Sequence, residues 1–167
     1  MNDAESIVEL IPRLRRYARA LAGDRTAADD LVQDTLERAW AKLHLYRRGT
    51  DLRAWLFTVM HNLYVNQLRA ARPGAQLDEE MPELALPARE TDMLVLRDLD
   101  LAIRRLPPDQ REVLLLVALE DMSYAEAAGA LEIPIGTVMS RLARAREKLR
   151  AMLPGLSTGG KQLKIVK

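Results

Sequence analysis

The chain has 167 residues, of which 49% are hydrophobic and only 4% aromatic, and its formal net charge is +1. This length suits one mid-sized domain or two small ones, and the hydrophobic content argues against a wholly disordered chain. Cysteine is absent, which excludes disulfides, thiolate metal sites and cysteine catalysis. Because the hydrophobic residues are mostly leucine and alanine, composition favours helices over a β-sandwich.

The N-terminus and the hydrophobic runs predict where the protein works. The opening segment MNDAESIVEL lacks the basic stretch and apolar core of a signal peptide. The longest apolar run, VLLLVAL at residues 113–119, is much shorter than the roughly 20 residues that cross a bilayer. We therefore expect a soluble, cytoplasmic protein with no membrane insertion.

Helical periodicity dominates the first half of the chain and predicts three helices, at about residues 4–22, 24–43 and 51–70. The first helix is expected to end at Gly23, because glycine is the usual residue just after a helix C-terminus. Asp24 or Thr26 is expected to cap the second helix, and Thr50 or Asp51 the third.

The second and third predicted helices each carry an apolar stripe. In the second helix it comprises Leu31, Val32, Thr35, Leu36, Ala39 and Trp40. In the third it comprises Leu52, Trp55, Leu56, Val59, Leu63 and Val65. We therefore predict that Trp40 and Trp55 are core residues, whereas Phe57 stays undecided between core packing and stacking. His44 and His61 have no companions at metal-ligand spacing, so no metal site is expected.

Residues 73–90 (PGAQLDEEMPELALPARE) contain three prolines, one glycine and five acids. Repeated prolines interrupt both helices and strands, so we interpret this segment as a flexible acidic linker. The alternative, a long ordered loop within one domain, is uncommon in compact proteins. The prediction is an all-α protein with two small helical domains, residues 1–72 and 91–153, followed by a disordered basic tail at 154–167.

The second half of the chain resumes the helical pattern at about residue 91 and keeps it to Arg105. The segment LPPD at 106–109 stops that helix and starts another, because proline suits the first turn of a helix. Ser123 and Glu126 have the spacing of a capping box and predict a further helix start.

The last predicted helix is amphipathic. Its apolar stripe comprises Ile135, Val138, Leu142, Ala145 and Leu149. Its opposite side carries hydroxyls and cations at Thr137, Ser140, Arg141, Arg144 and Lys148. With the short helix before it, this segment fits a helix-turn-helix whose second helix reads DNA. A surface helix with a solvated basic face explains the periodicity equally well, and Glu132 stands in the turn where glycine would be easier.

Charge is unevenly distributed along the chain. Acidic residues dominate residues 28–40 and 78–100, whereas basic residues dominate residues 47–72 and 135–150. Alternating blocks of this kind suit a protein with both basic and acidic partner surfaces.

Four segments resemble one family in its order and spacing. SYAEAAGALEIPIGTVMSRLARAREKLR (123–150) resembles the region-four helix-turn-helix of the extracytoplasmic-function group of bacterial sigma-70-type sigma factors. AIRRLPPDQREVLLL (102–116) is similar to the start of that region. AADDLVQDTLERAW (27–40) resembles the family's polymerase-binding helix, and YRRGTDLRAWLFTVMHNLYVNQLR (46–69) its promoter-melting region. The resemblance covers about residues 10–150.

The resemblance implies a protein that binds core RNA polymerase, recognises two promoter elements and opens the DNA, with no catalytic site and no cofactor. The positions that match the face docking on the β′ clamp helices are Asp30, Gln33, Asp34 and Glu37. The implied partners also include the β flap and promoter DNA. Residues 49–69 further resemble a subgroup tied to general stress responses, which implies control by an anti-sigma factor.

The resemblance also implies which residues of the first half of the chain bind the −10 element. The positions that match the family's −10-binding residues are Tyr46, Arg47, Arg48, Gly49, Thr50, Arg53, Asn62 and Arg69. The loop from Tyr46 to Thr50 matches one that holds a flipped base, and Asn62 matches a position beside that pocket. The arginines are expected to hold the phosphate backbone.

The positions that match the family's residues facing the −35 element are Thr137, Ser140, Arg141 and Arg144. Arg146 and Lys148 are expected to touch phosphates. Met139 departs from the family, which often has lysine or arginine there. Base contacts at that position, and with them promoter preference, are therefore open.

Three other functions compete with initiation. A sigma-like module that only sequesters an anti-sigma factor would keep the fold, although the retained DNA-facing residues argue against it. A one-domain transcriptional regulator would leave residues 27–69 unexplained. A hydrolase or transferase is least expected, because no phosphate-binding loop or catalytic arrangement is present by spacing. The promoter, the stimulus and the placement of the two domains are left open.

Overall fold

The computed structural model describes residues 2–71 and 91–153, which fold into helices joined by short connections. The elements in chain order are α1 (Asp3–Ala22), α2 (Arg25–Ala41), the 3-10 turn η1 (Leu43–Leu45), α3 (Leu52–Ala71), α4 (Thr91–Arg105), α5 (Pro108–Ala118), α6 (Tyr124–Leu131) and α7 (Ile135–Met152). The predicted all-α class is confirmed. The predicted linker at 73–90 and the predicted tail at 154–167 lie outside the described residues.

The limits of the first two helices follow from local side-chain chemistry. Asn2 caps α1 in a reciprocal box with Glu5, and the helix ends at Gly23, whose φ of 75° lies in the left-handed region that glycine favours. The side chain of Asp24 accepts a hydrogen bond from the Ala27 backbone N–H at 2.9 Å. Of the two candidate caps of α2, Asp24 is therefore the one used.

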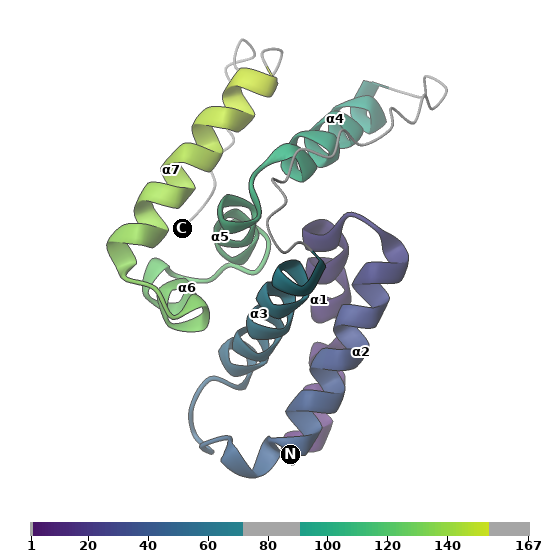
Figure 1. Ribbon diagram of the computed structural model, residues 1–167, viewed down its shortest axis with the longest axis vertical. Coiled ribbons are helices and arrows are strands. Elements are labelled where there is room, and N and C mark those ends of the chain that lie inside the picture. The colour runs from purple at the N-terminus through teal and green to yellow at the C-terminus, as the bar shows by residue number, and fades with distance from the viewer. Residues whose placement is uncertain (1, 72–90, 154–167) are drawn as a thin grey trace.

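The helices α1, α2 and α3 pack on one another around a shared core (Figure 1). Its largest buried side chains include Leu14, Leu21, Leu31, Leu56 and Met60. Phe57, which the sequence left undecided, is a core residue: its ring meets that of Tyr17 edge-on, with centroids 4.9 Å apart. Trp55 is half-buried and packs against this core.

The prediction that Trp40 is a core residue is wrong, because 60% of the side chain is exposed. At about 100° per residue, Trp40 lies roughly 125° from the middle of the stripe that α2 buries. The helical spacing of hydrophobic residues in the sequence included Trp40 in the apolar stripe, but the neighbouring, smaller Ala39 is the residue that is buried. Leu36 is partly buried and packs against the margin of the core.

The second group of helices, α4 to α7, is organised around α5. Every residue from Glu112 to Val117 is buried, because α5 is covered by α1, α6 and α7 on different sides. The predicted capping box is present at the start of α6, where Ser123 and Glu126 bond reciprocally at 2.7 and 3.1 Å. In α7 the predicted stripe is buried at Val138, Leu142 and Ala145, but Ile135 is 49% exposed, which corrects the prediction at that position.

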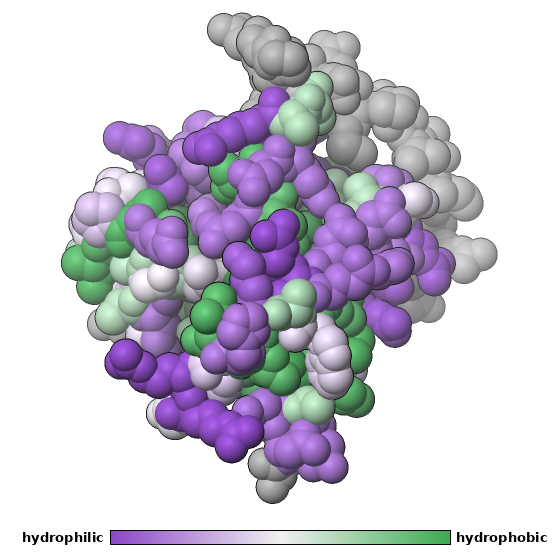
Figure 2. Space-filling view, turned by 60° about the horizontal axis from the view of Figure 1, so that its bottom comes forward, coloured by the Kyte–Doolittle hydropathy of each residue, from purple (hydrophilic) through white to green (hydrophobic). Residues whose placement is uncertain are grey.

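The two groups lie directly against each other, an arrangement that the sequence left open. Helix α1 contacts α4 and α5, and α3 contacts α6 (Figure 1). On the face shown in Figure 2, hydrophobic side chains reach the surface in separate patches between hydrophilic ones. In the two ranges that the structure describes, no helix is long and apolar enough to cross a membrane.

Candidate polymerase and nucleic-acid interfaces

The acidic residues predicted for polymerase binding form an exposed row on α2. Asp30, Gln33, Asp34 and Glu37 all face solvent. Two hydrogen bonds order the row: Gln33 donates to Glu37 at 3.2 Å, and Gln67 of α3 donates to Asp34 at 3.3 Å. Because the buried stripe of α2 is used within the fold, these carboxylates remain available to a basic partner.

A shallow apolar hollow adjoins this acidic row. It is lined by Leu36, Glu37, Trp40 and Ala41, and the next element, η1, exposes Leu45 as well. Sequence reasoning missed Trp40 as a surface residue, although its angular offset from the stripe was a usable signal. The α2 surface therefore combines carboxylates with an aromatic side chain, the composition expected where a protein partner docks.

The loop from Tyr46 to Thr50 is held in shape by its own polar groups. The Tyr46 hydroxyl donates to the Thr50 carbonyl at 2.5 Å, and the Thr50 hydroxyl donates to the Arg47 carbonyl at 2.7 Å. Gly49, with φ of 90°, closes the turn in a conformation that other residues rarely adopt. The ring of Tyr46 also lies 5.3 Å from that of Trp55, so the start of the loop is anchored on α3.

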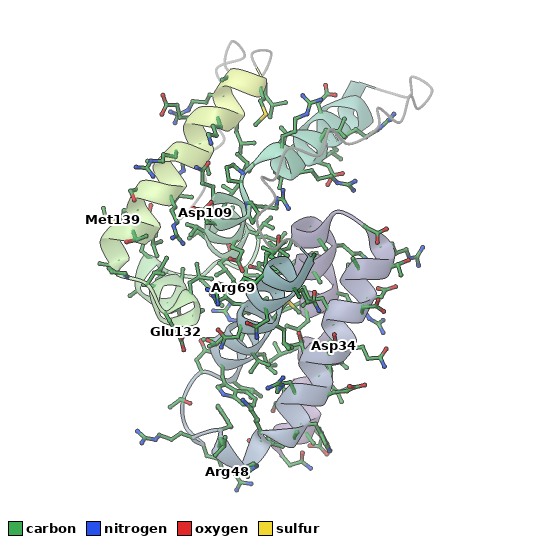
Figure 3. The ribbon with its side chains drawn as sticks, in the orientation of Figure 1. Asp34, Arg48, Arg69, Asp109, Glu132 and Met139 are labelled. Atoms are coloured by element: carbon green, nitrogen blue, oxygen red, sulfur yellow. The ribbon has the colours of Figure 1, made fainter. Side chains whose placement is uncertain are left out.

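The arginines and the asparagine predicted to bind the −10 element differ in their exposure and in their polar contacts within the protein. Arg47, Asn62 and Arg69 are exposed. Arg48 is exposed too, and its Nε lies 3.0 Å from a carboxylate oxygen of Asp3 at the start of α1 (Figure 3). A surface ion pair of this kind is weak and can exchange for a phosphate.

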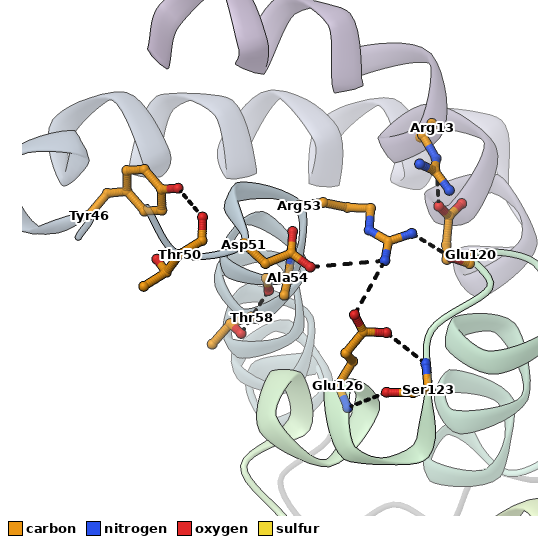
Figure 4. A network of polar contacts seen from close by, with 10 residues as sticks. All are labelled: Arg13, Tyr46, Thr50, Asp51, Arg53, Ala54, Thr58, Glu120, Ser123 and Glu126. Atoms are coloured by element: carbon orange, nitrogen blue, oxygen red, sulfur yellow. Dashed lines mark hydrogen bonds and ion pairs between the residues drawn. The ribbon is translucent and has the colours of Figure 1, made fainter. Parts of the chain in front are cut away.

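Arg53, in contrast, is engaged within the protein. Only 20% of its side chain is exposed, and it donates to the backbone carbonyl of Glu120 at 2.8 Å (Figure 4). Its guanidinium also lies 4.0 Å from the carboxylates of Asp51 and Glu126. The same Asp51 caps α3, accepting from the Ala54 backbone N–H at 3.2 Å.

The contact between the two helical groups centres on Glu120, whose side chain is fully buried. Arg13 donates to one of its carboxylate oxygens at 3.0 Å and Arg16 to the other at 3.2 Å. Arg16 also reaches the Leu119 carbonyl at 3.2 Å. With Arg53, these two arginines of the first group surround the connection between α5 and α6 in the second.

A second contact between the groups is made by Arg111 of α5. Its guanidinium donates to the carbonyl of Leu21, near the end of α1, at 2.7 Å. The same group donates to three carbonyls at the end of α4, those of Ile103, Arg104 and Leu106. It thereby caps one helix and ties it to another, and its burial lowers the pKa of Arg111.

His61 and Glu112 form a third contact, with Nδ1 of the histidine 2.7 Å from a carboxylate oxygen. Burial raises the pKa of Glu112, and the hydrogen bond from His61 partly opposes that rise. Among the described residues, no three acidic or histidine side chains gather as a metal-binding group.

The residues predicted to face the −35 element lie on α7 and are unequally accessible. Ser140, Arg144 and Lys148 are exposed, whereas Thr137 and Arg146 are half-buried. The Ser140 hydroxyl donates to the Thr137 carbonyl at 3.2 Å.

The side chain of Arg141 is only 28% exposed, and its guanidinium Nε lies 3.6 Å from a carboxylate oxygen of Asp109 on α5. The turn before α7 places Glu132 at φ 56°, a left-handed conformation that glycine would adopt more easily.

Comparison with known proteins identifies this arrangement. Residues 7–61 match the family model described as the Sigma2 domain of PhyR, and residues 96–149 match that of Sigma-70, region 4. A region-two domain followed by a region-four helix-turn-helix defines the class as sigma-70-type sigma factors, which direct RNA polymerase to promoters.

The particular group follows from a curated relative. The ECF RNA polymerase sigma factor EcfG of Rhodopseudomonas palustris is 38% identical over 151 residues, which cover 89% of this chain and 83% of the relative. The chain therefore belongs to the ECF sigma factors. These are transcription initiation factors that bind core RNA polymerase and promoter DNA, and the family is not a family of enzymes.

Solved structures show the same fold. The sigma factor RpoE from Bartonella quintana, determined in complex with the anti-sigma factor NepR, is 34% identical, with a TM-score of 0.74 over 90% of this chain and 96% of RpoE. The anti-anti-sigma factor PhyR of the same organism, complexed with NepR, is 18% identical with a TM-score of 0.63 over 91% of this chain and 51% of PhyR. The second likeness concerns the fold alone.

Proposed function

We propose that the protein divides its work as a sigma factor between its two helical groups: α2 binds core polymerase, α3 and the loop before it bind the −10 element, and α7 binds the −35 element. The observation that carries this proposal is the presence of two surfaces of opposite charge, an acidic row on α2 and exposed cations on α7. The corresponding domains are residues 1–72 and 91–153. The protein acts in the cytoplasm, where polymerase and DNA are, and catalyses no reaction itself.

Polymerase binding is assigned to Asp30, Gln33, Asp34 and Glu37 on the β′ clamp helices, with Trp40 as an apolar anchor beside them. An exposed tryptophan next to a charged row suits this role, because aromatic side chains carry much of the energy of protein interfaces. The charged residues contribute mainly to association rate and orientation. The region-four group contacts the β flap.

Binding of the −10 element is assigned to the loop Tyr46–Thr50 and to Asn62. Holding a flipped base requires a shaped pocket with polar groups, and this loop is already fixed by its own hydrogen bonds. Arg47, Arg48 and Arg69 are placed to neutralise phosphates, and Arg53 joins them once its contacts with the second helical group are released.

Binding of the −35 element is assigned to Thr137, Ser140, Arg141 and Arg144, which read bases in the major groove. Arg146 and Lys148 contact phosphates and fix the register of the helix on the duplex. Arg141 must leave Asp109 for this role, and because that contact is only a 3.6 Å approach at the surface, its loss costs little.

Control by an anti-sigma factor is part of the proposal. RpoE, which matches both helical groups of this chain, is solved with the anti-sigma factor NepR. We assign this protein to the general-stress type of regulation, with a NepR-like partner that competes with polymerase.

The test is run-off transcription with the purified chain, core polymerase and a library of genomic promoter fragments. Discrete start sites that depend on the chain would support the proposal and reveal both promoter elements. Wild-type core binding without any transcript would contradict it.

A second candidate function is sequestration of an anti-sigma factor, favoured by the match of residues 7–61 to the Sigma2 domain of PhyR. It predicts tight binding to a NepR-like protein and no binding to core polymerase. Co-elution with core polymerase would reject it.

A further inference from the structure

Helix α7 exposes two large hydrophobic side chains one turn apart, Ile135 at 49% and Met139 at 53%. Residues four apart on a helix are neighbours on one face, so the two form a single apolar edge. Single exposed hydrophobic residues are common on protein surfaces. The other exposed positions of α7 are glycine, alanine, serine or charged residues, so Ile135 and Met139 are the two large hydrophobic side chains that this helix exposes.

The position of this edge follows from the residues that α7 buries. Val138, Leu142 and Ala145 are buried, and α7 packs against α4, α5 and α6. At about 100° per residue, Ile135 and Met139 lie on one flank of the outer surface, Arg144 lies on the other, and Ser140 lies between them. Figure 3 shows Met139 on the side of α7 turned away from the labelled Asp109 of α5. The edge is also at the N-terminal end, the end that recognition helices direct at bases.

We propose that Ile135 and Met139 read a thymine methyl group in the −35 element; this inference rests on the proposed role of α7. Neither side chain can donate a hydrogen bond or pair with a phosphate. In the major groove the C5-methyl of thymine is the one apolar group that a base pair offers, so it is the feature that such an edge can recognise.

A nucleic acid is favoured over a protein partner for this edge because of its surroundings. Arg144, Lys148 and Arg150 are exposed on the same helix, and with Arg146 they give α7 the positive charge that a polyanion attracts. Ser140, beside the apolar pair, is small enough to let the helix backbone approach base edges.

The test uses the full chain with core polymerase and promoter duplexes that carry the −35 element found by run-off transcription. Each thymine of that element is replaced in turn by deoxyuridine, which removes only the methyl group. At one position we expect holoenzyme binding to weaken about fourfold, the value for one buried methyl group. The double variant Ile135→Ala, Met139→Ala should bind both duplexes equally, whereas the control Leu101→Ala, at an exposed position on α4, should keep the fourfold difference.

Three results separate the possibilities. If deoxyuridine has no effect at any −35 thymine while scrambling the whole element abolishes selective binding, methyl reading is wrong and the role of α7 stands. If scrambling has no effect either, the proposed function fails. If the double variant keeps its deoxyuridine sensitivity but loses binding to an anti-sigma factor, the edge is a protein contact and the proposal is overturned.

Discussion

The fully buried carboxylate of Glu120 offers the sharpest test of how the two helical groups are held together. It belongs to the connection between α5 and α6 and receives both Arg13 and Arg16 of α1. The substitution Glu120→Gln keeps the size of the side chain and removes its charge. We expect the groups to separate more often, because the charge-assisted hydrogen bonds become neutral ones.

The magnitude follows from the exposure of the partners. A hydrogen bond to a charged group contributes about 1.5–3 kcal/mol, but Arg13 and Arg16 are 37% and 54% exposed and regain water when released. With that discount, the substitution weakens the contact between the groups by about 2 kcal/mol, or roughly 30-fold in the population of separated molecules. Replacing both arginines should cost more, because it leaves Glu120 buried and unpaired.

The separation can be measured directly because the chain has no cysteine. Spin labels at Arg38→Cys on α2 and Ala143→Cys on α7, both exposed positions, report the distance between the groups. Glu120→Gln should broaden the distance distribution towards longer values, and the control Glu9→Gln, an exposed carboxylate of α1, should leave it unchanged. Identical distributions and identical unfolding midpoints for the two variants would refute the reasoning.

Four further predictions concern the interfaces and the buried acid. Arg144→Ala should weaken binding to −35 duplexes about tenfold in a mobility-shift assay and leave core binding intact; an equal loss of both would contradict the division of labour. Charge reversal at Asp30 and Asp34 should weaken core binding about tenfold or more with the melting temperature unchanged, and an unaltered core affinity would discard the docking role. Trp40→Ala should also weaken core binding about tenfold while changing the free energy of unfolding by less than about 0.5 kcal/mol, because the side chain is exposed; a large loss of stability would show that it packs in the fold. Burial raises the pKa of Glu112, so the folded state binds the proton of this carboxyl more tightly than the unfolded state, and the stabilisation from that proton is present below the usual pKa of 4.5 and lost as pH rises through the folded pKa. In denaturant titrations, the free energy of unfolding of Glu112→Gln should therefore increase relative to that of the wild type as pH rises. A difference between the two proteins that does not change with pH would contradict this.

Much of the local structure could be predicted because it depends on nearby residues. Gly23 ends α1 through its own φ angle, and Asp24 caps α2 through a hydrogen bond three residues away. Ser123 and Glu126 form their box within one turn. The family could be identified on the same footing, because its segments are contiguous runs of sequence.

The candidate site was only partly predictable, and the features that the sequence did not show have one cause in common. Arg53 and Arg141 were assigned to DNA from their positions, but in the fold they also contact carboxylates and a carbonyl from other elements. Trp40 was assigned to the core from spacing, yet α2 buries a narrower stripe than its hydrophobic residues would allow. Periodicity gives the side of a helix on which a residue lies, but not how far neighbouring helices cover that side.

The sequence by itself determined the helical class, most of the helix limits, the helix-turn-helix and the sigma-factor family, because these depend on local propensities, caps and contiguous motifs. Only the tertiary structure decided how the two helical groups meet, through Glu120 with its two arginines, Arg111 with the carbonyl of Leu21, and His61 with Glu112. These contacts join residues about 50 to 107 positions apart in the chain. A polar side chain is buried only where a partner satisfies it, and the sequence near that side chain does not indicate which distant residue the partner will be.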